Sequence, residues 1–246
     1  MWYWHPASIS SGVLDQRGIA FLSPDEVARY HRYLVPTAAT TFLAARVFLR
    51  AVLSQYAGLP PAAWRFETNE FGRPHVANLD APRGHSFNLS HRPGCVVCLV
   101  GAARELGVDV EDSGAERSHF LEIAARFFSP SEAAELRGLP AAQGAKRFFE
   151  LWTLKESYVK ARGVGLSLGL SRFSFSVEGD RATVRFGEGV DDSAESWDFR
   201  LFRPDERHTI ATSVRRTAAP VTIEVADAAE LVWRALGGPA DLSRGS

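Results

Sequence analysis

Apolar side chains recur at helical spacing between residues 148 and 159, which predicts a largely buried helix. The bulky apolar residues of this segment are Phe148, Phe149, Leu151, Trp152, Leu154, Tyr158 and Val159. Trp152, Glu156 and Lys160 are spaced by four positions, so a helix places them on one face. Taken alone, Glu156 and Lys160 are typical of a surface ion pair. The surrounding apolar residues instead place Lys155 and Glu156 at the edge of an apolar surface, where an unpaired charge is costly.

Short apolar runs bounded by turn residues predict strands on both sides of this chain's midpoint. The predicted strands cover residues 86–90, 94–101, 182–186, 197–202 and 209–214, and two more begin near Trp64 and Arg172. Glycine, proline and asparagine mark the turns between them. Residues 221–236 predict a short strand and a helix. Helices that precede antiparallel strands favour an α+β fold over a doubly wound sheet.

Two similar helix-start sequences indicate an internal duplication. Phe21-Leu-Ser23-Pro24-Asp-Glu26 resembles Phe127-Phe-Ser129-Pro130-Ser-Glu132, which lies 106 residues later. Each has a serine N-cap, a proline in the first turn and a glutamate three residues after the serine, which predicts a capping box. The same displacement places Phe42 on Phe148 and Arg50 on Glu156. The ordered series of matches favours a repeated half over chance.

We therefore predict a pseudo-dimer of two similar α+β halves. The first half covers residues 1–104, the second covers 105–225, and a C-terminal helix and tail occupy 226–246. Ligand sites favour interfaces of this kind, so we expect the active site between the halves. Acidic residues at the matched positions are confined to the second half. We therefore expect the first half to bind an anionic ligand, and the second to hold a metal and the chemistry.

Composition narrows the class of protein. The net charge of −1 argues against a general nucleic-acid or membrane-surface binder, which usually carries a basic excess. We find no run of about eighteen apolar residues of the kind that spans a membrane. Residues 1–6 lack the basic region and apolar core of a secretory signal. Cys95 and Cys98 lie in an apolar run and are predicted to be buried and reduced, which fits a cytoplasmic protein.

An acidic motif, Gly107-Val108-Asp109-Val110-Glu111, lies on a predicted strand. Asp109 and Glu111 are two residues apart, so both point to one face while the valines point to the other. Two carboxylates at this distance repel each other unless a cation lies between them. With Glu156 the set has three carboxylates, which suits a magnesium ion held jointly by protein and a pyrophosphate. The alternative is a solvent-facing acidic edge.

Two predicted turns carry residues that could contact phosphate. In Asn88-Leu-Ser90-His91-Arg92-Pro-Gly94, His91 and Arg92 can donate hydrogen bonds to phosphate oxygens, although a histidine in a turn is more often only solvated. Phe71-Gly-Arg73-Pro74 is a turn by default, with Arg73 as a candidate phosphate or base contact.

These motifs together resemble those of the 4′-phosphopantetheinyl transferase superfamily. The resemblance rests on Gly107-Val-Asp109-Val-Glu111 and on Trp152-Thr-Leu-Lys155-Glu156-Ser-x-x-Lys160-x-x-Gly163-x-Gly165-Leu166. The duplication and the motifs around Ser129, Ser90 and Arg73 resemble its surfactin-type branch, whose members are monomers built as pseudo-dimers. The match runs from about Ser23 to Phe175.

The resemblance implies that coenzyme A donates its phosphopantetheine arm to a serine of an acyl or peptidyl carrier protein, and that 3′,5′-ADP is released. It implies Asp109, Glu111 and Glu156 as ligands of Mg²⁺, for which Mn²⁺ can substitute. Glu156 would also take the proton of the carrier serine, and Lys160 would hold the pyrophosphate. The implied coenzyme A contacts are Arg29, Arg73, Pro74, Ser90, His91, Arg92, Lys155 and Lys160. Whether Lys155 is a phosphate contact or a structural ion-pair partner stays open.

Two alternatives remain beside the transferase. One is another magnesium enzyme, such as a phosphodiesterase, and the other is a non-catalytic coenzyme A-binding module. The resemblance further implies service to polyketide or nonribosomal peptide synthetases in secondary metabolite biosynthesis. Carrier proteins tend to be acidic, and the candidate basic contacts for them are Arg117, Arg126, Lys146 and Arg147.

Overall fold

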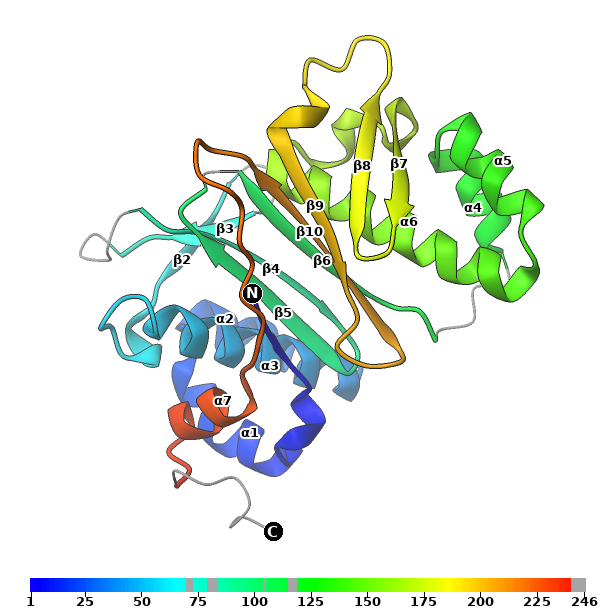
Figure 1. Cartoon of the computed structure of the whole chain (residues 1–246). Coiled ribbons are helices and arrows are strands. Elements are labelled where there is room, and N and C mark those ends of the chain that lie inside the picture. The colour runs from blue at the N-terminus through cyan, green and yellow to red at the C-terminus, as the bar shows by residue number, and fades with distance from the viewer. Residues whose placement is uncertain (70–72, 79–83, 104, 115–118, 240–246) are drawn as a thin grey trace. The chain divides into compact units, whose positions relative to one another are not determined.

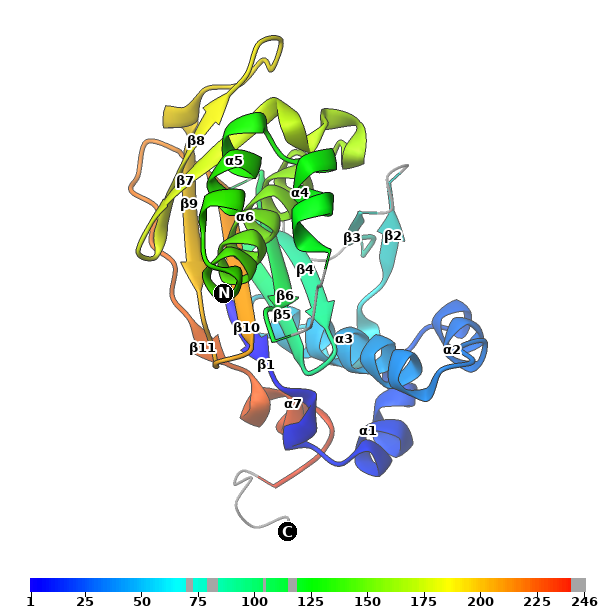
Figure 2. The same cartoon turned by 90° about the vertical axis from the view of Figure 1, so that its right-hand side faces the viewer.

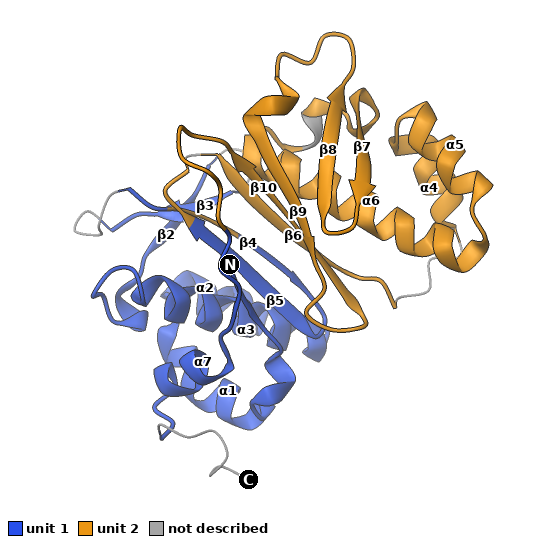
Figure 3. Ribbon diagram, in the orientation of Figure 1, with its two compact units in different colours: residues 1–85, 89–100, 223–246 blue, residues 86–88, 101–222 orange. Residues whose placement is uncertain are grey.

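The same succession of a capped helix, a long apolar helix and antiparallel strands occurs twice along the chain (Figure 1). The computed structural model describes residues 1–69, 73–78, 84–103, 105–114 and 119–239. They divide into two compact units (Figure 3). Unit 1 contains residues 1–85, 89–100 and 223–246, and unit 2 contains residues 86–88 and 101–222. The described residues after 223 therefore belong with the first part of the chain.

Unit 1 is built around the long helix α3. Its elements are β1 (Trp2–Trp4), α1 (Ser11–Gly18), α2 (Pro24–His31), α3 (Pro36–Ser54), β2 (Phe66–Thr68), β3 (Pro74–Val76), β11 (Ala226–Asp227), α7 (Ala229–Ala235) and most of β4 (Ser86–Arg92) and β5 (Cys95–Gly101). The four-stranded sheet has the order β11-β1-β5-β4, with β1 antiparallel to β5 and parallel to β11. Strands β2 and β3 form a separate antiparallel pair.

Unit 2 packs its longest helix on an antiparallel sheet (Figure 2). Its elements are β6 (Leu106–Asp112), α4 (Phe120–Phe127), α5 (Pro130–Gly138), α6 (Ala141–Arg162), β7 (Phe173–Glu178), β8 (Arg181–Phe186), β9 (Trp197–Phe202) and β10 (His208–Arg215). The five strands have the order β6-β10-β9-β8-β7. Aromatic residues of α6 and of the sheet, such as Tyr158, Phe173 and Trp197, form the core. Short 3-10 turns lie at Pro6–Ser8, Ile19–Phe21, Pro61–Ala63, Gly165–Leu168, Leu170–Arg172 and Ala194–Ser196.

The predicted α+β class and the two similar halves are confirmed, and both predicted capping boxes are present. In α2 the hydroxyl of Ser23 accepts from the Glu26 amide, while the Glu26 carboxylate accepts from the Ser23 amide. Ser129 and Glu132 make the same reciprocal pair at α5. The sequence pattern is local, which is why the prediction holds to the residue.

Each capping glutamate also forms an ion pair with a buried cation, and the two pairs correct the sequence alignment. Glu26 contacts the guanidinium of Arg50 on α3 at 2.6 Å, and Arg50 lies over the ring of Phe66. The contacts therefore make Arg50 the first-half counterpart of the second-half cation that pairs with Glu132. That cation is Lys155, not a group at position 156, so the alignment of Arg50 with Glu156 was wrong by one residue.

Four elements were not predicted from the sequence: β1, α1, β3 and α4. The membrane expectation also needs correction, because α3 is long and apolar enough by composition to cross a membrane. However, 61% of its most apolar window is buried within the described structure, as in the core helix of a globular protein. Cys95 and Cys98 are both buried, as predicted, and neither forms a disulfide. Burial raises the pKa of the Cys98 thiol to about 12, which keeps it protonated.

Candidate active site

A glycine lets the acidic strand β6 pack directly against α6. A Cβ atom at Gly107 would lie 2.0 Å from the carbonyl oxygen of Ser157 and 2.5 Å from the amide nitrogen of Ala161. Only glycine permits this approach. Gly107, Asp109 and Glu111 alternate along the strand and therefore share a face, so the acidic face is the one that meets α6. The valines at 108 and 110 point to the other face, and both are fully buried.

Strand β6 runs antiparallel to α6, which brings the predicted residues together. Glu105, just before β6, pairs with Arg162 at the end of α6, and Gly107 lies beside Ala161 one residue earlier on the helix. A strand advances about 3.3 Å per residue and a helix about 1.5 Å. The strand residues from Asp109 to the end of β6 therefore lie beside the part of α6 that precedes Ala161 and contains Glu156. Side chains on a helix lean toward its N-terminus, so Glu156 leans toward the second carboxylate of the strand.

An ion pair between Lys160 and Asp109 marks this junction. The Lys160 Nζ donates to Asp109 Oδ1 at 2.6 Å. Asp109 is 4% exposed and Glu111 is 2% exposed, whereas Lys160 and Glu156 are partly exposed. A buried carboxylate needs a compensating positive charge, and here the Lys160 ammonium supplies one to Asp109. The oxygen donors match what Mg²⁺ prefers in proteins, so this residue set fits that metal.

Lys155 differs from its neighbour Lys160, because it is turned into the core. It is 0% exposed, contacts Glu132 at 2.9 Å, and donates to the carbonyls of Leu170 and Phe173. Its ammonium also lies over the ring of Phe173, as Arg50 of unit 1 lies over a phenylalanine. The expectation of an edge position is therefore wrong, and Lys155 has no exposed atom to offer coenzyme A. Burial lowers the pKa of Lys155, and the charge of Glu132 opposes that shift.

Trp152 packs on one side of α6, and Gly163 caps its C-terminal end. Trp152 stacks on Phe148 and also packs near Phe128, so it contributes to the core at the edge of α6. The helix ends at Gly163, whose φ of 65° is left-handed. Glycine adopts this conformation without strain, which places the end of α6 three residues after Lys160.

Unit 1 contains a pocket of roughly 500 Å³ that gathers several of the predicted coenzyme A contacts. It is lined by Arg29, Tyr33, Thr37, Ala38, Thr41, Phe42, Ala45, Arg46, Pro74, Leu89, His91, Arg92 and Pro93. Of the predicted contacts in this unit, Arg29, Pro74, His91 and Arg92 line the pocket. Ser90 is 7% exposed and does not line it. Arg73 lies next to Pro74 but is not a lining residue, and Phe71 and Gly72 lie outside the described residues.

The pocket has a positively charged lining, and only some of its charged residues were predicted from the sequence. Three arginines and one histidine line it, and the lining residues that the structure describes include no carboxylate. Arg46 was missed, although it is the first charged residue of α3. Both Arg29 and Arg46 lie 5.2 Å from the centre of the Phe42 ring. Burial lowers the pKa of Arg46, Glu26 opposes that shift, and Arg29 adds to it. A phosphate would relieve the repulsion between these two arginines.

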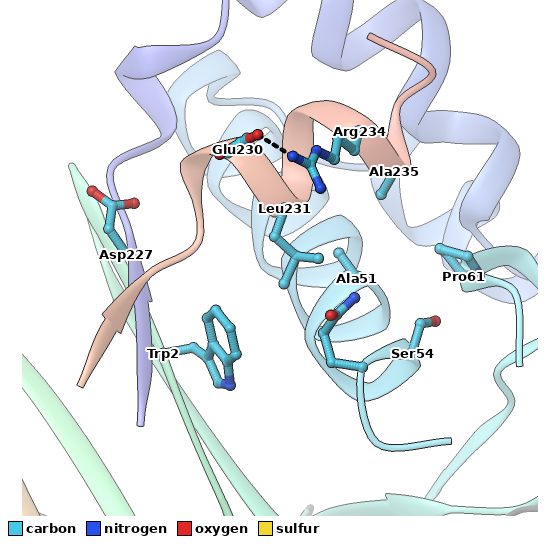
Figure 4. A pocket seen from close by; sticks show the side chains of 10 residues that line it. Trp2, Ala51, Ser54, Pro61, Asp227, Glu230, Leu231, Arg234 and Ala235 are labelled. Atoms are coloured by element: carbon cyan, nitrogen blue, oxygen red, sulfur yellow. Dashed lines mark hydrogen bonds and ion pairs between the residues drawn. The ribbon is translucent and has the colours of Figure 1, made fainter. Parts of the chain in front are cut away.

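A second pocket of unit 1, of roughly 460 Å³, has the opposite electrostatic character (Figure 4). It is lined by Trp2, Ala51, Ser54, Gln55, Pro61, Asp227, Glu230, Leu231, Arg234 and Ala235. Glu230 and Arg234 form an ion pair at its rim, as Figure 4 shows. The remaining charge is that of Asp227, so an anionic ligand is attracted to the first pocket and not to this one.

Of the candidate carrier contacts, Arg126 and Lys146 are exposed. Arg147 is engaged by Glu135 and Glu150, and Arg117 lies outside the described residues. The apolar side chains of Leu121 and Phe127 on α4 are each 40% exposed. The exposed part of α4 therefore combines apolar and basic groups.

Comparison with known proteins relates both parts of the chain to one family. Residues 4–104 match the family described as 4′-phosphopantetheinyl transferase, N-terminal, and residues 105–214 match the 4′-phosphopantetheinyl transferase superfamily. A phosphopantetheinyl transferase of Thraustochytrium is 30% identical over 96% of this chain and 82% of its own length. The 4′-phosphopantetheinyl transferase Sfp of Bacillus subtilis is 34% identical over 68% of this chain and 71% of its own. The 4′-phosphopantetheinyl transferase HetI of Nostoc is 39% identical over 60% of this chain, and the match spans 62% of HetI.

Proposed function

Because the chain belongs to the 4′-phosphopantetheinyl transferase superfamily, we propose that it transfers the 4′-phosphopantetheine group of coenzyme A to a serine of an acyl or peptidyl carrier protein and releases 3′,5′-ADP. The observation that carries this proposal is the ion pair of Lys160 with the buried Asp109 where β6 packs against α6, on the strand face that also bears Glu111. Transfer of a phosphoryl-type group depends mainly on positioning and charge neutralisation. Three carboxylates and one ammonium at a partly exposed edge are suited to both tasks.

Asp109, Glu111 and Glu156 would hold a magnesium ion, and Mn²⁺ could replace it. A bound Mg²⁺ supplies positive charge to the pyrophosphate and lowers the pKa of a coordinated hydroxyl group. Glu156 accepts the proton of the carrier serine, directly or through a water molecule. Lys160 donates hydrogen bonds to the pyrophosphate and offsets the charge of the leaving phosphate. Its ion pair with Asp109 at 2.6 Å supports this role, because it orients the ammonium beside the acidic face.

The pocket of unit 1 would bind the nucleotide part of coenzyme A. This molecule carries a 3′-phosphate apart from its pyrophosphate, and the chain offers a separate positive pocket for it. Arg29, Arg46 and Arg92, with His91, are the donors for this phosphate. The Phe42 ring and Pro74 provide apolar surface for the base. Lys155 and Ser90 are buried and are therefore left out of the proposed contacts.

Carrier proteins of polyketide or nonribosomal peptide synthetases are the proposed acceptors. An acidic carrier would dock where exposed cations adjoin apolar surface, as Arg126 does beside Leu121 and Phe127 on α4. We further propose that the protein acts as a cytoplasmic monomer. Its two buried cysteines, which form no disulfide, suit a reducing compartment, and both family halves lie within one chain.

The test is incubation with fluorescent coenzyme A, Mg²⁺ and a panel of apo-carrier proteins. We expect the wild-type protein to label at least one carrier, and EDTA to abolish labelling until Mg²⁺ or Mn²⁺ is restored. Glu156→Gln should abolish transfer and leave the Kd for coenzyme A within about tenfold, or about 1.4 kcal/mol. Glu135→Gln is the matched control, because Glu135 is a 46%-exposed glutamate of α5 in the same unit.

The other outcomes separate the alternatives. Binding of coenzyme A without labelling of any carrier would favour a non-catalytic coenzyme A-binding module. Release of 3′,5′-ADP in the absence of carrier would favour a phosphodiesterase. A fully active Glu156→Gln variant would refute the assignment of Glu156 as base and metal ligand.

A further inference from the structure

Four charged side chains form a closed network where β6 begins and α6 ends in unit 2. They are Glu105, Arg162, Asp192 and Arg215. Arg162 contacts Glu105 at 3.3 Å and Asp192 at 2.5 Å. Arg215 contacts Asp192 at 2.7 Å and Glu105 at 3.4 Å. Each arginine therefore bridges both carboxylates, and the charges of the four groups cancel.

Asp192 is the buried member of this network. Its side chain is 1% exposed, whereas that of Glu105 is 36% exposed. Its Oδ2 also accepts hydrogen bonds from the Tyr158 hydroxyl at 2.6 Å and the Trp197 indole at 3.0 Å. Removal of the carboxylate would therefore take the acceptor from the Tyr158 hydroxyl and leave the two guanidinium groups joined only through the partly exposed Glu105.

Asp192 holds α6 at two points on the side away from the acidic face. Tyr158 and Arg162 are one helical turn apart, and both donate to its Oδ2. With about 100° of rotation per residue, Tyr158 lies about 200° around the helix from Glu156, and Arg162 lies about 200° from Lys160. Fixing one side of the helix therefore fixes the direction in which Glu156 and Lys160 point.

Glu105 and Arg215 connect the sheet of unit 2 to the same end of α6. Glu105 directly precedes β6, and Arg215 ends β10, which pairs with β6 along its length. The network thus joins the start of the acidic strand to the end of α6. A slip of α6 by one residue would move its side chains about 1.5 Å. That shift is large for Mg²⁺, which requires ligands at about 2.0–2.1 Å in near-octahedral geometry.

We propose that Asp192 is a positioning residue, which sets the rotation and axial register of α6 on β6. In this role it holds Glu156 and Lys160 opposite Asp109 and Glu111. Because its side chain is 1% exposed, Asp192 acts through α6 and not by contact with a substrate. The inference rests on the proposed transferase function, and it adds a residue far from the family motifs in sequence.

The experiment compares Asp192→Asn with Asp198→Asn. Asp198 is a matched control, since its side chain is 6% exposed and also contacts two arginines, Arg200 and Arg216, at 2.8 and 3.5 Å. Those contacts lie on β9 and after β10, so they do not reach α6. Three quantities are measured for each variant: the Tm, the transfer kinetics with the carrier that wild type labels best, and Mn²⁺ binding by electron paramagnetic resonance with coenzyme A present.

We expect both variants to lose stability, and only Asp192→Asn to lose site geometry. For Asp192→Asn, kcat should fall by about tenfold or more, and the Kd for Mn²⁺ should rise by about tenfold, while the Kd for coenzyme A alone stays within about twofold. Asp198→Asn should keep both its kcat and its Mn²⁺ affinity. A gentler variant, Tyr158→Phe, removes one anchor without a charge and should raise the Kd for Mn²⁺ in the same direction.

Equal kcat and Mn²⁺ affinity in Asp192→Asn and wild type would overturn the proposal, and so would equal losses in Asp192→Asn and Asp198→Asn. If the wild-type protein labels no carrier, the proposed transferase function is contradicted. The positioning role of Asp192 is then decided by Mn²⁺ binding alone. If Asp192→Asn is too unstable to purify, Tyr158→Phe and Glu105→Gln decide by the same Mn²⁺ measurement. Unchanged Mn²⁺ affinity in both variants would refute the proposed positioning role of Asp192.

Discussion

Replacement of Lys155 by methionine tests whether the first lysine of the family motif supports the fold or binds the substrate. Methionine has a similar length and keeps the apolar packing of the stem. The substitution removes an ammonium that is 0% exposed and that contacts Glu132 at 2.9 Å. Glu132, itself 2% exposed, would keep hydrogen bonds from Ser129 and from the Phe175 amide. It would lose its only described positive partner.

The expected cost follows from that arrangement. Breaking a buried ion pair by removing one partner costs about 3–5 kcal/mol, because the other charge remains in the interior. For a chain of this length each kcal/mol lowers the Tm by about 2–4 °C, so Lys155→Met should lower it by about 6–20 °C. The double variant Lys155→Met/Glu132→Gln leaves no unpaired charge of this ion pair in the interior. It should therefore be more stable than the sum of the single effects predicts, by about 1–3 kcal/mol.

Thermal and urea denaturation of the two single variants and the double variant measure this coupling. Arg234→Met is the control, since its ion pair with Glu230 is more than half exposed and should contribute about 0–1 kcal/mol. Coenzyme A binding by calorimetry completes the test, and we expect the Kd for Lys155→Met to stay within about twofold of wild type below its Tm. A variant with normal Tm and strongly weakened coenzyme A binding would refute the reasoning and restore Lys155 as a substrate contact.

Three further predictions concern single positions. Gly107→Ala should lower the free energy of unfolding, measured by urea denaturation, by about 3 kcal/mol or more, because its Cβ would clash with the backbone of α6. Gly138→Ala, with open space around it, should not lower this free energy. Arg29→Ala should weaken coenzyme A binding by about tenfold in calorimetry, whereas Arg17→Ala, outside the lining of the positive pocket, should leave the Kd unchanged. Burial alone would raise the pKa of Asp192, but hydrogen bonds from Tyr158 and Trp197 lower it overall. Its carboxylate therefore stabilises the fold above about pH 4, and this contribution is lost as the pH falls through the lower folded-state pKa, so that Asp192→Asn should lose less stability than wild type on acidification.

The parts of the fold that sequence predicted well are those encoded by neighbouring residues. A capping box needs only Ser23 and Glu26, or Ser129 and Glu132, and both were found as expected. The shared face of Asp109 and Glu111 follows from the two-residue period of a strand. By contrast, β11 pairs with β1 across more than two hundred residues of chain, and no local pattern carries that pairing. The strand β1 was missed for the same reason.

The surroundings of the predicted site residues could not be predicted from the sequence. Lys155 and Lys160 look alike in sequence, yet one is fully buried and the other partly exposed. The difference depends on Glu132, which the chain brings from a separate helix, and on carbonyls that follow α6. Asp192 carries no motif at all, since it lies in an irregular segment before β9 and meets α6 only in the folded unit. Arg46 was visible as a cation of α3, but its membership of a pocket depends on α2 and β4.

The corrected alignment agrees with the proposal that the chemistry belongs to one half. If Arg50 matches Lys155, then Ala51 matches Glu156, and Gln55 matches Lys160. Both halves keep the same scaffold, in which a capping glutamate pairs with a buried cation of the long helix. Ala51, which Figure 4 labels, and Gln55 line the second pocket of unit 1, so this pocket adjoins the positions equivalent to Glu156 and Lys160. There an alanine and a neutral amide stand in place of the Glu156 carboxylate and the Lys160 ammonium. The duplicated fold thus provides equivalent positions in both halves, and in the proposed transferase only the second half carries a carboxylate and an ammonium at them.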